Sequence, residues 1–395
     1  KPRLYRVVQH RPQRDLSVDL RLVSRLSAEI GGIFMSVQLY TGSLSLVRKS
    51  GVGRAVEHQR EMLRRSGIDV TVRPSPDARV VHCNTVFPDS LAAALWAKLR
   101  GKKVVFYGHS TMEDFRDSFR GSNFLAPLFR RWIMLCYNRG DVVITPTEYS
   151  RRLLTDYGVR RPVYALSNGV DTGFFAPSQE RRRAFRAQYG LREEDKVVMS
   201  VGHTIARKGL PEFVQLARSL PDVRFFWFGH TPPELIPRNI REAMDNAPEN
   251  LCFPGFVERE ELRDAYCGCD VFAFLSHEET EGIVVLEALA CGIPVVLRDI
   301  PVYEGWLTHG VQVYKAGDDA QVLREVSGLL DGSLPSLAEA GLQTARSRSL
   351  EAMGALLRGI YEKEHLPYDT PAQLLPDQLA RRQTAMLPGS RHRMG

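Results

Sequence analysis

The 395-residue sequence has no long apolar run and few cysteines. No apolar stretch reaches the roughly 18 residues that a membrane-spanning helix needs, so we do not expect an integral membrane protein. No basic segment followed by a short apolar core predicts a secretory signal. The six cysteines are scattered, and Cys267-Gly268-Cys269 has no second pair at zinc-binding spacing. We therefore predict reduced thiols, a cytoplasmic location and no bound metal.

The central part of the sequence also lacks an excess of positive charge. The formal net charge is +7, but residues 1–34 hold seven Lys/Arg against three Asp/Glu, and residues 366–395 hold four against two. The region between these ends is therefore close to neutral. A nucleic-acid-binding domain concentrates positive charge on its folded body. We therefore expect no nucleic-acid partner.

The two ends are predicted to lie outside the folded domains. Residues 1–34 are Arg-rich and show no clean apolar period, so we expect a basic N-terminal extension. A basic arm that contacts a membrane is the alternative. Residues 366–395 are Pro-rich and contain several Arg, and we expect a disordered tail there.

From residue 35 onward, strand-like and helix-like segments alternate. This alternation predicts an α/β fold with parallel sheets covered by helices on both faces. A polar, Arg-rich stretch at 177–195 is predicted to connect two such series. We expect an N-terminal Rossmann-like domain at 35–172, a second one at 173–349 and a helix at 350–365. The predicted strands are 37–40, 67–72, 79–84, 102–107, 141–145 and 162–166, then 196–202, 223–229, 251–256, 270–275, 293–297 and 311–314.

The stretch 276–297 combines a cluster of carboxylates with the predicted start of a helix. Gly282 is expected to precede that helix, so Glu279 lies on the loop and Glu287 more than a turn inside the helix. The unpaired amides of residues 282–284 and the helix macrodipole favour an anion there. Two carboxylates beside an anion site suggest a ligand with both hydroxyl groups and phosphate, such as a nucleotide sugar.

Two more candidates follow predicted strands at the carboxyl edge, where open α/β sheets bind ligands. His109 directly follows the strand 102–107, and a buried structural histidine is the alternative. Arg207 and Lys208 follow the strand 196–202. Arg binds a diphosphate through its planar fork and Lys as a point charge, so this pair suits a diphosphate. An exposed charge pair is the alternative.

Glycines and polar residues in the first half offer further candidates. Gly51 and Gly53 begin the helix after the first strand but match only part of the dinucleotide fingerprint, so we disfavour NAD binding. Close approach of this backbone to a phosphate stays credible. The polar residues Glu113, Asp114 and Arg116 could hold acceptor hydroxyls or form a solvated face.

The segment 124–137 is apolar with a basic interruption at Arg130 and Arg131. Such a segment suits docking on an anionic membrane surface. A helix that packs into the core explains the pattern as well, and we favour that interpretation.

Together these residues resemble the retaining glycosyltransferases of family 4, which have the two-domain GT-B fold. Glu279 and Glu287 match the Glu-x7-Glu motif, and the run from Gly282 through Ala288–Val296 fits its continuation. The resemblance covers about 36–364. The other matching segments are Arg207-Lys208-Gly209, Ser50-Gly51-Val52-Gly53 and Ser167-Asn168-Gly169-Val170-Asp171.

The sequence departs from the family pattern at two places. Glu279-Thr280-Glu281-Gly282 stands where the family often has Glu-Gly-Phe-Gly, and His203 stands where many members have Arg. A narrower similarity, to Gram-positive enzymes that extend diacylglycerol glycolipids, rests on Lys49–Ala55, His109–Arg116 and Arg298–Pro301.

The resemblance implies a retaining, metal-independent hexosyltransferase without a cofactor. It would move glucose or galactose from a nucleotide-diphosphate sugar, such as UDP-glucose or UDP-galactose, to a glycolipid such as a glucosyl-diacylglycerol. It also implies that the C-terminal helix crosses back to the N-terminal domain, and contact with the cytoplasmic membrane face is an open expectation. The implied catalytic residues are His109 and Glu279. The implied nucleotide-sugar-binding residues are Gly51, Gly53, Arg207, Lys208, Gly282, Ile283, Val284 and Glu287. The implied acceptor residues are Glu113, Asp114 and Arg116.

Three other functions stay open at this point. The first is a glycosyltransferase of cell-surface polysaccharide synthesis. The others are a non-catalytic nucleotide-sugar-binding protein and a peripheral membrane protein.

Overall fold

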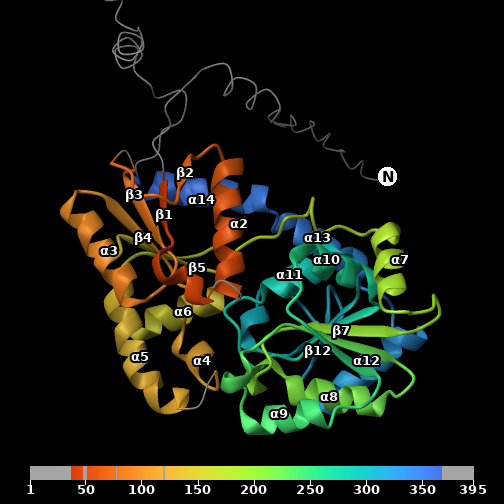
Figure 1. Cartoon of the computed structure of the whole chain (residues 1–395). Helices are drawn as coiled ribbons and strands as arrows, with labels where there is room; N and C mark the ends of the chain where they lie inside the picture. The colour runs from red at the N-terminus through yellow and green to blue at the C-terminus, as the bar shows by residue number, and fades with distance from the viewer. Residues whose placement is uncertain (1–36, 48–50, 77, 119–120, 367–395) are drawn as a thin grey trace, which may run out of the picture. The chain divides into compact units, whose positions relative to one another are not determined.

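The computed structural model describes residues 37–47, 51–76, 78–118 and 121–366 (Figure 1). The predicted extension at 1–34 and all but the first residue of the predicted tail lie outside these ranges. That first residue, Leu366, is buried in the core of the first sheet.

The first half is built on a parallel sheet with the strand order β2-β1-β3-β4-β5-β6. Its central strands are nearly continuous apolar runs, which is typical of parallel strands covered on both faces. The strands are β1 (Val37–Tyr40), β2 (Val70–Thr71), β3 (Val80–Cys83), β4 (Lys103–Tyr107), β5 (Val142–Thr145) and β6 (Val163–Ala165).

Helices cover both faces of this first sheet. One face packs against α3 (Pro88–Leu99), α5 (Ser122–Tyr137) and α6 (Glu148–Tyr157), whose buried side chains include Ala94, Ile133 and Leu154. The other face packs against α2 (Gly51–Arg65) and α14 (Leu350–Lys363). Among the described residues, no helix is both long and apolar enough to cross a bilayer.

The second half repeats the architecture with the strand order β12-β11-β10-β7-β8-β9. Its strands are β7 (Val197–Val201), β8 (Arg224–Phe228), β9 (Leu251–Gly255), β10 (Val271–Phe274), β11 (Val295–Arg298) and β12 (Tyr314–Ala316). Its helices are α7 (Gln179–Gln188), α8 (Leu210–Ser219), α9 (Arg238–Asp245), α10 (Arg259–Gly268), α11 (Ile283–Ala290), α12 (Asp319–Asp331) and α13 (Ala338–Ser347). The predicted class, two Rossmann-like domains with parallel sheets, is confirmed.

The C-terminal helix α14 belongs to the core of the first half. The hydroxyl of Ser349 caps it by accepting a hydrogen bond from the backbone N–H of Ala352. Apolar side chains at helical spacing, among them Met353 and Leu357, are buried against the first sheet. In Figure 1, α14 lies beside the first sheet although it follows the whole second half in sequence. The predicted crossing back is confirmed.

The prediction of a polar connection at 177–195 missed the helix α7. Ser178 caps this helix, and Phe185 is its fully buried apolar anchor. Arg182 and Arg186 look solvent-facing in the sequence, but both reach the carboxylate of Asp270, at 2.9 and 3.1 Å. The helix therefore packs through ion pairs as well as apolar contacts, and a hydrophobic pattern does not reveal such packing.

The predicted polar loop after His109 also contains a short helix, α4 (Met112–Phe115). The hydroxyl of Thr111 accepts a hydrogen bond from the N–H of Asp114 at 3.1 Å and starts this helix.

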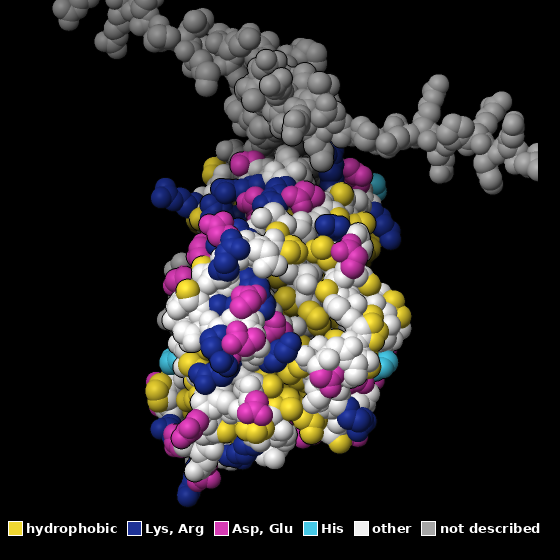
Figure 2. Space-filling model, turned by 90° about the vertical axis from the view of Figure 1, so that its right-hand side faces the viewer, with side chains coloured by type: hydrophobic (Ala, Val, Ile, Leu, Met, Phe, Trp, Pro, Cys, Tyr) yellow, Lys and Arg dark blue, Asp and Glu magenta, His cyan; other side chains and the backbone are white. Residues whose placement is uncertain are grey.

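Basic and acidic side chains are interspersed on the face of the molecule that Figure 2 shows. This agrees with the nearly neutral composition of the body. Ion pairs such as Arg182–Asp270 give this mixing a local cause.

We predict that Leu357→Ala lowers the free energy of unfolding by about 2–5 kcal/mol, because the side chain of Leu357 is fully buried between α14 and the first sheet. Leu356→Ala is the matched control, since its neighbour in the same helix is 57% exposed. It should change stability by no more than about 0.5 kcal/mol. Urea titration followed by circular dichroism measures both. Equal losses would contradict the docking of α14 on the first half.

Candidate functional site

Helix α11 begins at a glycine with a left-handed backbone. Gly282 has a φ of +86°, which an L-residue with a side chain rarely adopts, so glycine suits this position. The N–H of Val285 already bonds the carbonyl of Gly282 at 2.9 Å. The N–H groups of Ile283 and Val284 belong to the first turn, which lacks intrahelical acceptors. As expected, Glu279 lies on the loop before α11 and Glu287 inside it.

Glu279 forms a buried ion pair with Lys208. The Nζ of Lys208 lies 2.5 Å from Oε1 of Glu279, whose side chain is only 9% exposed. Burial raises the pKa of Glu279, but Lys208 and then Arg207 outweigh that effect and hold the pKa below its ordinary value. Glu279 is therefore a carboxylate anion at neutral pH.

Arg207 and Lys208 lie on a tight turn after β7 (Ala206–Lys208). The turn ends at Gly209, where a Cβ would lie 2.3 Å from the carbonyl oxygen of Leu275. Only glycine therefore lets this turn approach the loop before Glu279. The N–H of His277 donates to the carbonyl of Arg207 at 2.8 Å and fixes the approach.

The guanidinium of Arg207 reaches the first half. Its Nη1 donates to the carbonyl of Glu278 at 2.8 Å and lies 2.8 Å from Oδ1 of Asp114 in α4. The structure thus brings Arg207, which we expect to bind the diphosphate, together with Asp114, which we expect to bind the acceptor.

Glu287 is fully buried, and only one of its two carboxylate oxygens has a hydrogen bond within the described residues. Its Oε2 accepts a hydrogen bond from the hydroxyl of Tyr266 at 3.1 Å. Its Oε1 lies 3.7 Å from Nε of Arg54 but has no hydrogen bond within the described residues. Burial raises the pKa of Glu287, and Arg54 opposes this. A buried carboxylate oxygen without a hydrogen bond is costly, and such an oxygen can accept a hydrogen bond from a ligand hydroxyl.

His109 follows β4 and is 6% exposed. Its ring stacks on Tyr107 with centroids 5.2 Å apart, and its Nε2 lies 3.3 Å from Oδ1 of Asn84. Burial lowers the pKa of His109 to about 4, so the ring is neutral at physiological pH. Among the described residues, no hydrogen bond or ion pair joins His109 to Glu279.

Gly51 and Gly53 lie in the first turn of α2, as predicted. A Cβ on Gly51 would meet nothing within 4 Å, whereas Gly53 is buried. Among the described residues, neither glycine has a hydrogen bond to the second half, but Arg54, next in the chain after Gly53, reaches Glu287.

The loop between Glu278 and Gly282 is the main polar contact with the first half. The carbonyl of Thr280 accepts hydrogen bonds from the hydroxyls of Thr147 and Ser150, at 2.9 and 3.0 Å. The hydroxyl of Tyr149 donates to the carboxylate of Glu278 at 3.1 Å. One stretch of the second half therefore holds both the carboxylates and the contacts across the cleft.

The departure from the family pattern at Glu281 has a structural role. Glu281 is 1% exposed, and its Oε2 accepts hydrogen bonds from the backbone N–H and side-chain Nδ2 of Asn168, at 3.1 and 2.6 Å. Asn168 belongs to the turn before the link between the two halves. Glu281 therefore ties the loop of the site to that link.

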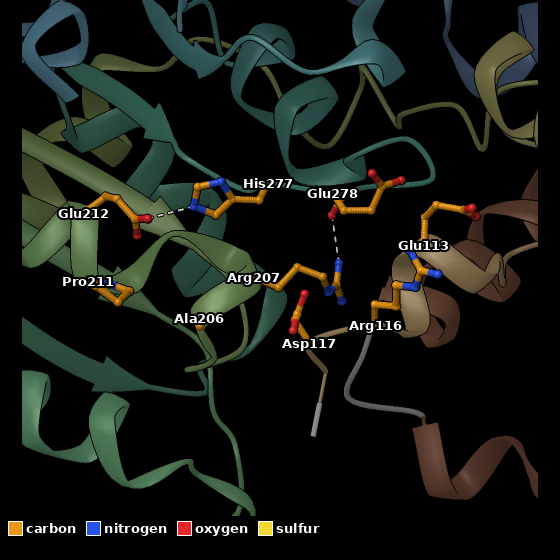
Figure 3. Close-up of a pocket in the computed structure, with 9 residues that line it drawn as sticks. All are labelled: Glu113, Arg116, Asp117, Ala206, Arg207, Pro211, Glu212, His277 and Glu278. Atoms are coloured by element: carbon orange, nitrogen blue, oxygen red, sulfur yellow. Dashed lines mark hydrogen bonds and ion pairs between the residues drawn. The ribbon is translucent and has the colours of Figure 1, made fainter. Parts of the chain in front are cut away.

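A cavity of about 380 Å³ opens between α4 and the second half. In Figure 3, the side chain of Arg207 lies in its middle, between Glu278 and Asp117. Burial, then the charges of Asp114, Glu113 and Glu279, raise the pKa of Glu278 to about 7, while the Tyr149 hydroxyl opposes them. The cavity is lined by Glu113, Arg116, Asp117, Ala206, Arg207, Pro211, Glu212, His277 and Glu278.

Sequence reasoning missed several residues of this site. Arg54 has a signal in hindsight, because it directly follows Gly51-Val52-Gly53 in the first turn of α2. Glu278 adjoins the predicted Glu279. Tyr149 and Tyr266 have no sequence signal, because each reaches its carboxylate from a different helix.

Family models and known proteins match most of this chain. Residues 73–174 match the family described as "Glycosyltransferase Family 4", and residues 181–345 match "Glycosyl transferases group 1". The chain is 38% identical over 331 residues to the processive diacylglycerol alpha-glucosyltransferase of Acholeplasma laidlawii, covering 83% of this chain and 98% of that protein.

Two further likenesses extend the comparison. The chain is 27% identical over 332 residues to the alpha-galactosylglucosyldiacylglycerol synthase of Streptococcus pneumoniae, covering 80% of this chain and 87% of that protein. The crystal structure of Anabaena HepE in complex with UDP-glucose aligns with a TM-score of 0.69 at 16% identity, covering 84% of this chain and all of that one. At this identity the second likeness concerns the fold.

We predict that Glu278→Gln stabilises the protein at pH 8 but not at pH 5. The pKa of Glu278 is about 7 in the folded state against an ordinary 4.5, so the folded state holds this proton more tightly. Ionising Glu278 therefore costs stability as the pH rises from 4.5 to 7, and the whole cost is present above 7. The neutral amide removes it. Urea unfolding at both pH values measures the difference.

Glu260→Gln is the control for this experiment, because Glu260 lies on the exposed side of α10. Its effect should be similar at the two pH values. A Glu278→Gln variant that is no more stable than wild type at pH 8 would contradict the raised pKa.

Proposed function

Because the chain belongs to the family 4 glycosyltransferases with the GT-B fold, we propose that it transfers a hexosyl group from a UDP-sugar to a hydroxyl of a membrane glycolipid. Glucose or galactose is the transferred sugar, and a glucosyl-diacylglycerol is the type of acceptor. The activities named for the Acholeplasma and Streptococcus relatives support this choice.

The relatives' names also support retention at the anomeric carbon. UDP-glucose carries its sugar in the α configuration, and the Acholeplasma relative is named an alpha-glucosyltransferase. An α-linked product from an α-linked donor keeps the configuration.

The main support for the proposed donor site is the side chain of Glu287. Its Oε1 is buried and without a hydrogen bond in the described part of the chain, inside helix α11. In this proposal Glu287 accepts hydrogen bonds from ribose hydroxyls, and the N–H groups at residues 282–284 meet the donor's sugar and phosphate. Arg207 and Lys208 bind the diphosphate, with Gly51 and Gly53 approaching it from the first half.

The proposed reaction breaks the bond between the anomeric carbon and the phosphate oxygen. The diphosphate leaves with the bonding electrons, and the acceptor oxygen forms a new bond on the same face of the sugar. The acceptor hydroxyl gives its proton to the leaving phosphate oxygen. Lys208 stabilises the charge that develops on the diphosphate, without a metal ion. The Glu279 carboxylate faces the sugar as its anomeric carbon gains oxocarbenium character.

The cavity in Figure 3 suits the acceptor's sugar head group. Each half contributes carboxylates and one guanidinium to its walls, and such groups bind hydroxyls. Glu113, Asp114 and Arg116 are the acceptor residues of this proposal, and Glu278 joins them from the second half.

Contact with a membrane surface completes the proposal, and two helices of the first half support it. On α5, Phe124 and Leu128 are 88% and 64% exposed, and on α3, Trp96 and Leu99 are 57% and 81% exposed. Both helices cover the same face of the first sheet. Exposed basic residues, Arg131 and Arg100, accompany these side chains. Apolar side chains beside cations suit an anionic lipid surface.

We predict that Lys208→Ala lowers turnover at least about a hundredfold, because it removes a cation from the leaving diphosphate. The assay offers radiolabelled UDP-glucose and UDP-galactose with glycolipid and soluble acceptors. Lys196→Ala is the control, since Lys196 is exposed at the start of β7. Lys208→Ala also leaves Glu279 unpaired, so Lys208→Ala/Glu279→Gln keeps the charge balanced and should be equally inactive. Near-wild-type turnover of the double variant would contradict both roles.

We predict that Phe124→Ser/Leu128→Ser lowers the partition coefficient onto phosphatidylglycerol vesicles at least about tenfold, because two exposed apolar side chains are lost. Co-sedimentation measures the partition, and added salt should weaken wild-type binding. Leu235→Ser is the control, since Leu235 is 57% exposed in the second half. Equal partition of wild type and double variant would remove this surface from the proposal.

A further inference from the structure

A row of three buried polar side chains ends at His109. Gln59 lies on α2, Asn84 follows β3, and His109 follows β4, and their exposed fractions are 1%, 2% and 6%. The Nδ2 of Asn84 donates to Oε1 of Gln59 at 2.8 Å. The Oδ1 of Asn84 lies 3.3 Å from Nε2 of His109. A helix and the segments that follow two adjacent strands therefore share one hydrogen-bonded row.

The direction of these hydrogen bonds fixes the proton on the imidazole ring. Because Nδ2 of Asn84 donates to Gln59, the amide oxygen of Asn84 is the atom that faces His109. An amide oxygen only accepts hydrogen bonds, so Nε2 of His109 must carry the proton. Stacking on Tyr107 holds the plane of the ring.

The other ring nitrogen is therefore an acceptor. Burial lowers the pKa of His109 to about 4, and no neighbouring charge contributes to this shift. The ring is neutral at physiological pH, and a neutral imidazole with its proton on Nε2 can only accept at Nδ1. Within the described residues, the ring of His109 is hydrogen-bonded at Nε2 and not at Nδ1, so Nδ1 is the polar ring atom left for a ligand.

We infer that Gln59 and Asn84 are positioning residues that hold His109 in the Nε2–H tautomer, so that Nδ1 accepts a hydrogen bond from one hydroxyl of the donor sugar. This inference rests on the proposed function. It gives the site a preference, because an acceptor matches a hydroxyl but repels a carboxylate or carbonyl oxygen at the same place. The row therefore selects a neutral hexose over its oxidised counterpart.

The tautomer is tested directly by nitrogen-15 NMR on the full-length chain with labelled histidine. His109→Gln identifies the signals of His109. Wild type should show the proton on Nε2, and Asn84→Leu, which removes the accepting oxygen, should move it partly or wholly to Nδ1. Thr85→Val is the matched control, because its hydroxyl bonds Ser90 and not this row. A proton on Nδ1 in wild type, or no change in Asn84→Leu, would overturn the inference.

The selectivity is tested with UDP-glucose and a set of UDP-deoxyglucoses, each lacking one hydroxyl. For wild type, one analogue should lose at least about tenfold in kcat/KM relative to UDP-glucose. With UDP-glucose, the kcat/KM of Asn84→Leu should be lower than that of wild type by the same factor. With that analogue, Asn84→Leu and wild type should have similar kcat/KM values. Thr85→Val should behave like wild type with both donors. If Asn84→Leu lowers kcat/KM by the same factor with every donor, the row has only a structural role and the inference is overturned.

The variant Asn84→Asp should change the pH profile of the reaction. Asn84→Asp places a carboxylate beside Nε2, and this charge raises the pKa of His109. When the pH is below that pKa, Nδ1 carries a proton and can no longer accept a hydrogen bond. The kcat/KM of this variant should fall toward acid pH, while wild type shows no such fall from His109. A kcat/KM of Asn84→Asp that does not change with pH would contradict the role of this row in keeping Nδ1 free to accept a hydrogen bond. If wild type transfers no sugar from any UDP-hexose, the proposed function fails, and the NMR result still decides the tautomer.

Discussion

The buried ion pair between Lys208 and Glu279 is the interaction on which the rest of the site depends. It joins the turn after β7 to the loop before α11, and Arg207, next in the chain, continues the contact to Asp114 in the first half. Removing one partner would leave an uncompensated buried charge, which costs about 3–5 kcal/mol. Both cations of the proposed diphosphate site are thus already paired with carboxylates. A bound diphosphate has to compete with Asp114 and Glu279 for these cations, so donor binding is coupled to the contact between the halves.

The two halves are held together by two kinds of contact. Helix α14 packs its apolar side chains into the first sheet, and such packing is lost only by unfolding. Across the cleft there are polar contacts of Thr280 with Thr147, Glu278 with Tyr149, and Arg54 with Glu287, and Tyr149 also packs against the core of the second half. Polar pairs can exchange partners with a ligand at little cost, and interfaces of this kind permit relative domain motion. Helix α14 therefore keeps the two halves together. The polar contacts still allow the halves to move relative to each other when the proposed donor binds.

Much of the fold could be predicted from the sequence because the buried strands are short apolar runs between helical periods. The site was predicted where its residues are close in sequence, as with Glu279, Gly282 and Glu287. What was missed depends on distant partners. Helix α7 looks like a polar connection because its arginines pair with Asp270, more than eighty residues away. The contact of Arg54 with Glu287, and the row from Gln59 to His109, arise only when the parallel strands bring separate segments to one edge.

Three acidic residues of the loop before α11, Glu278, Glu279 and Glu281, differ in their surroundings and therefore in their chemistry. Glu279 has Lys208 at 2.5 Å and stays ionised, so it can place a fixed negative charge beside the sugar of the proposed donor. Glu278 faces other carboxylates, and its pKa of about 7 leaves it partly protonated, so it can donate as well as accept a hydrogen bond. Glu281 is turned to Asn168 and fixes the loop. If Glu278 were as strongly ionised as Glu279, the charges of these two neighbouring residues would repel each other. In the proposed reaction, this difference in pKa gives Glu279 a role at the donor and Glu278 a role at the neutral acceptor.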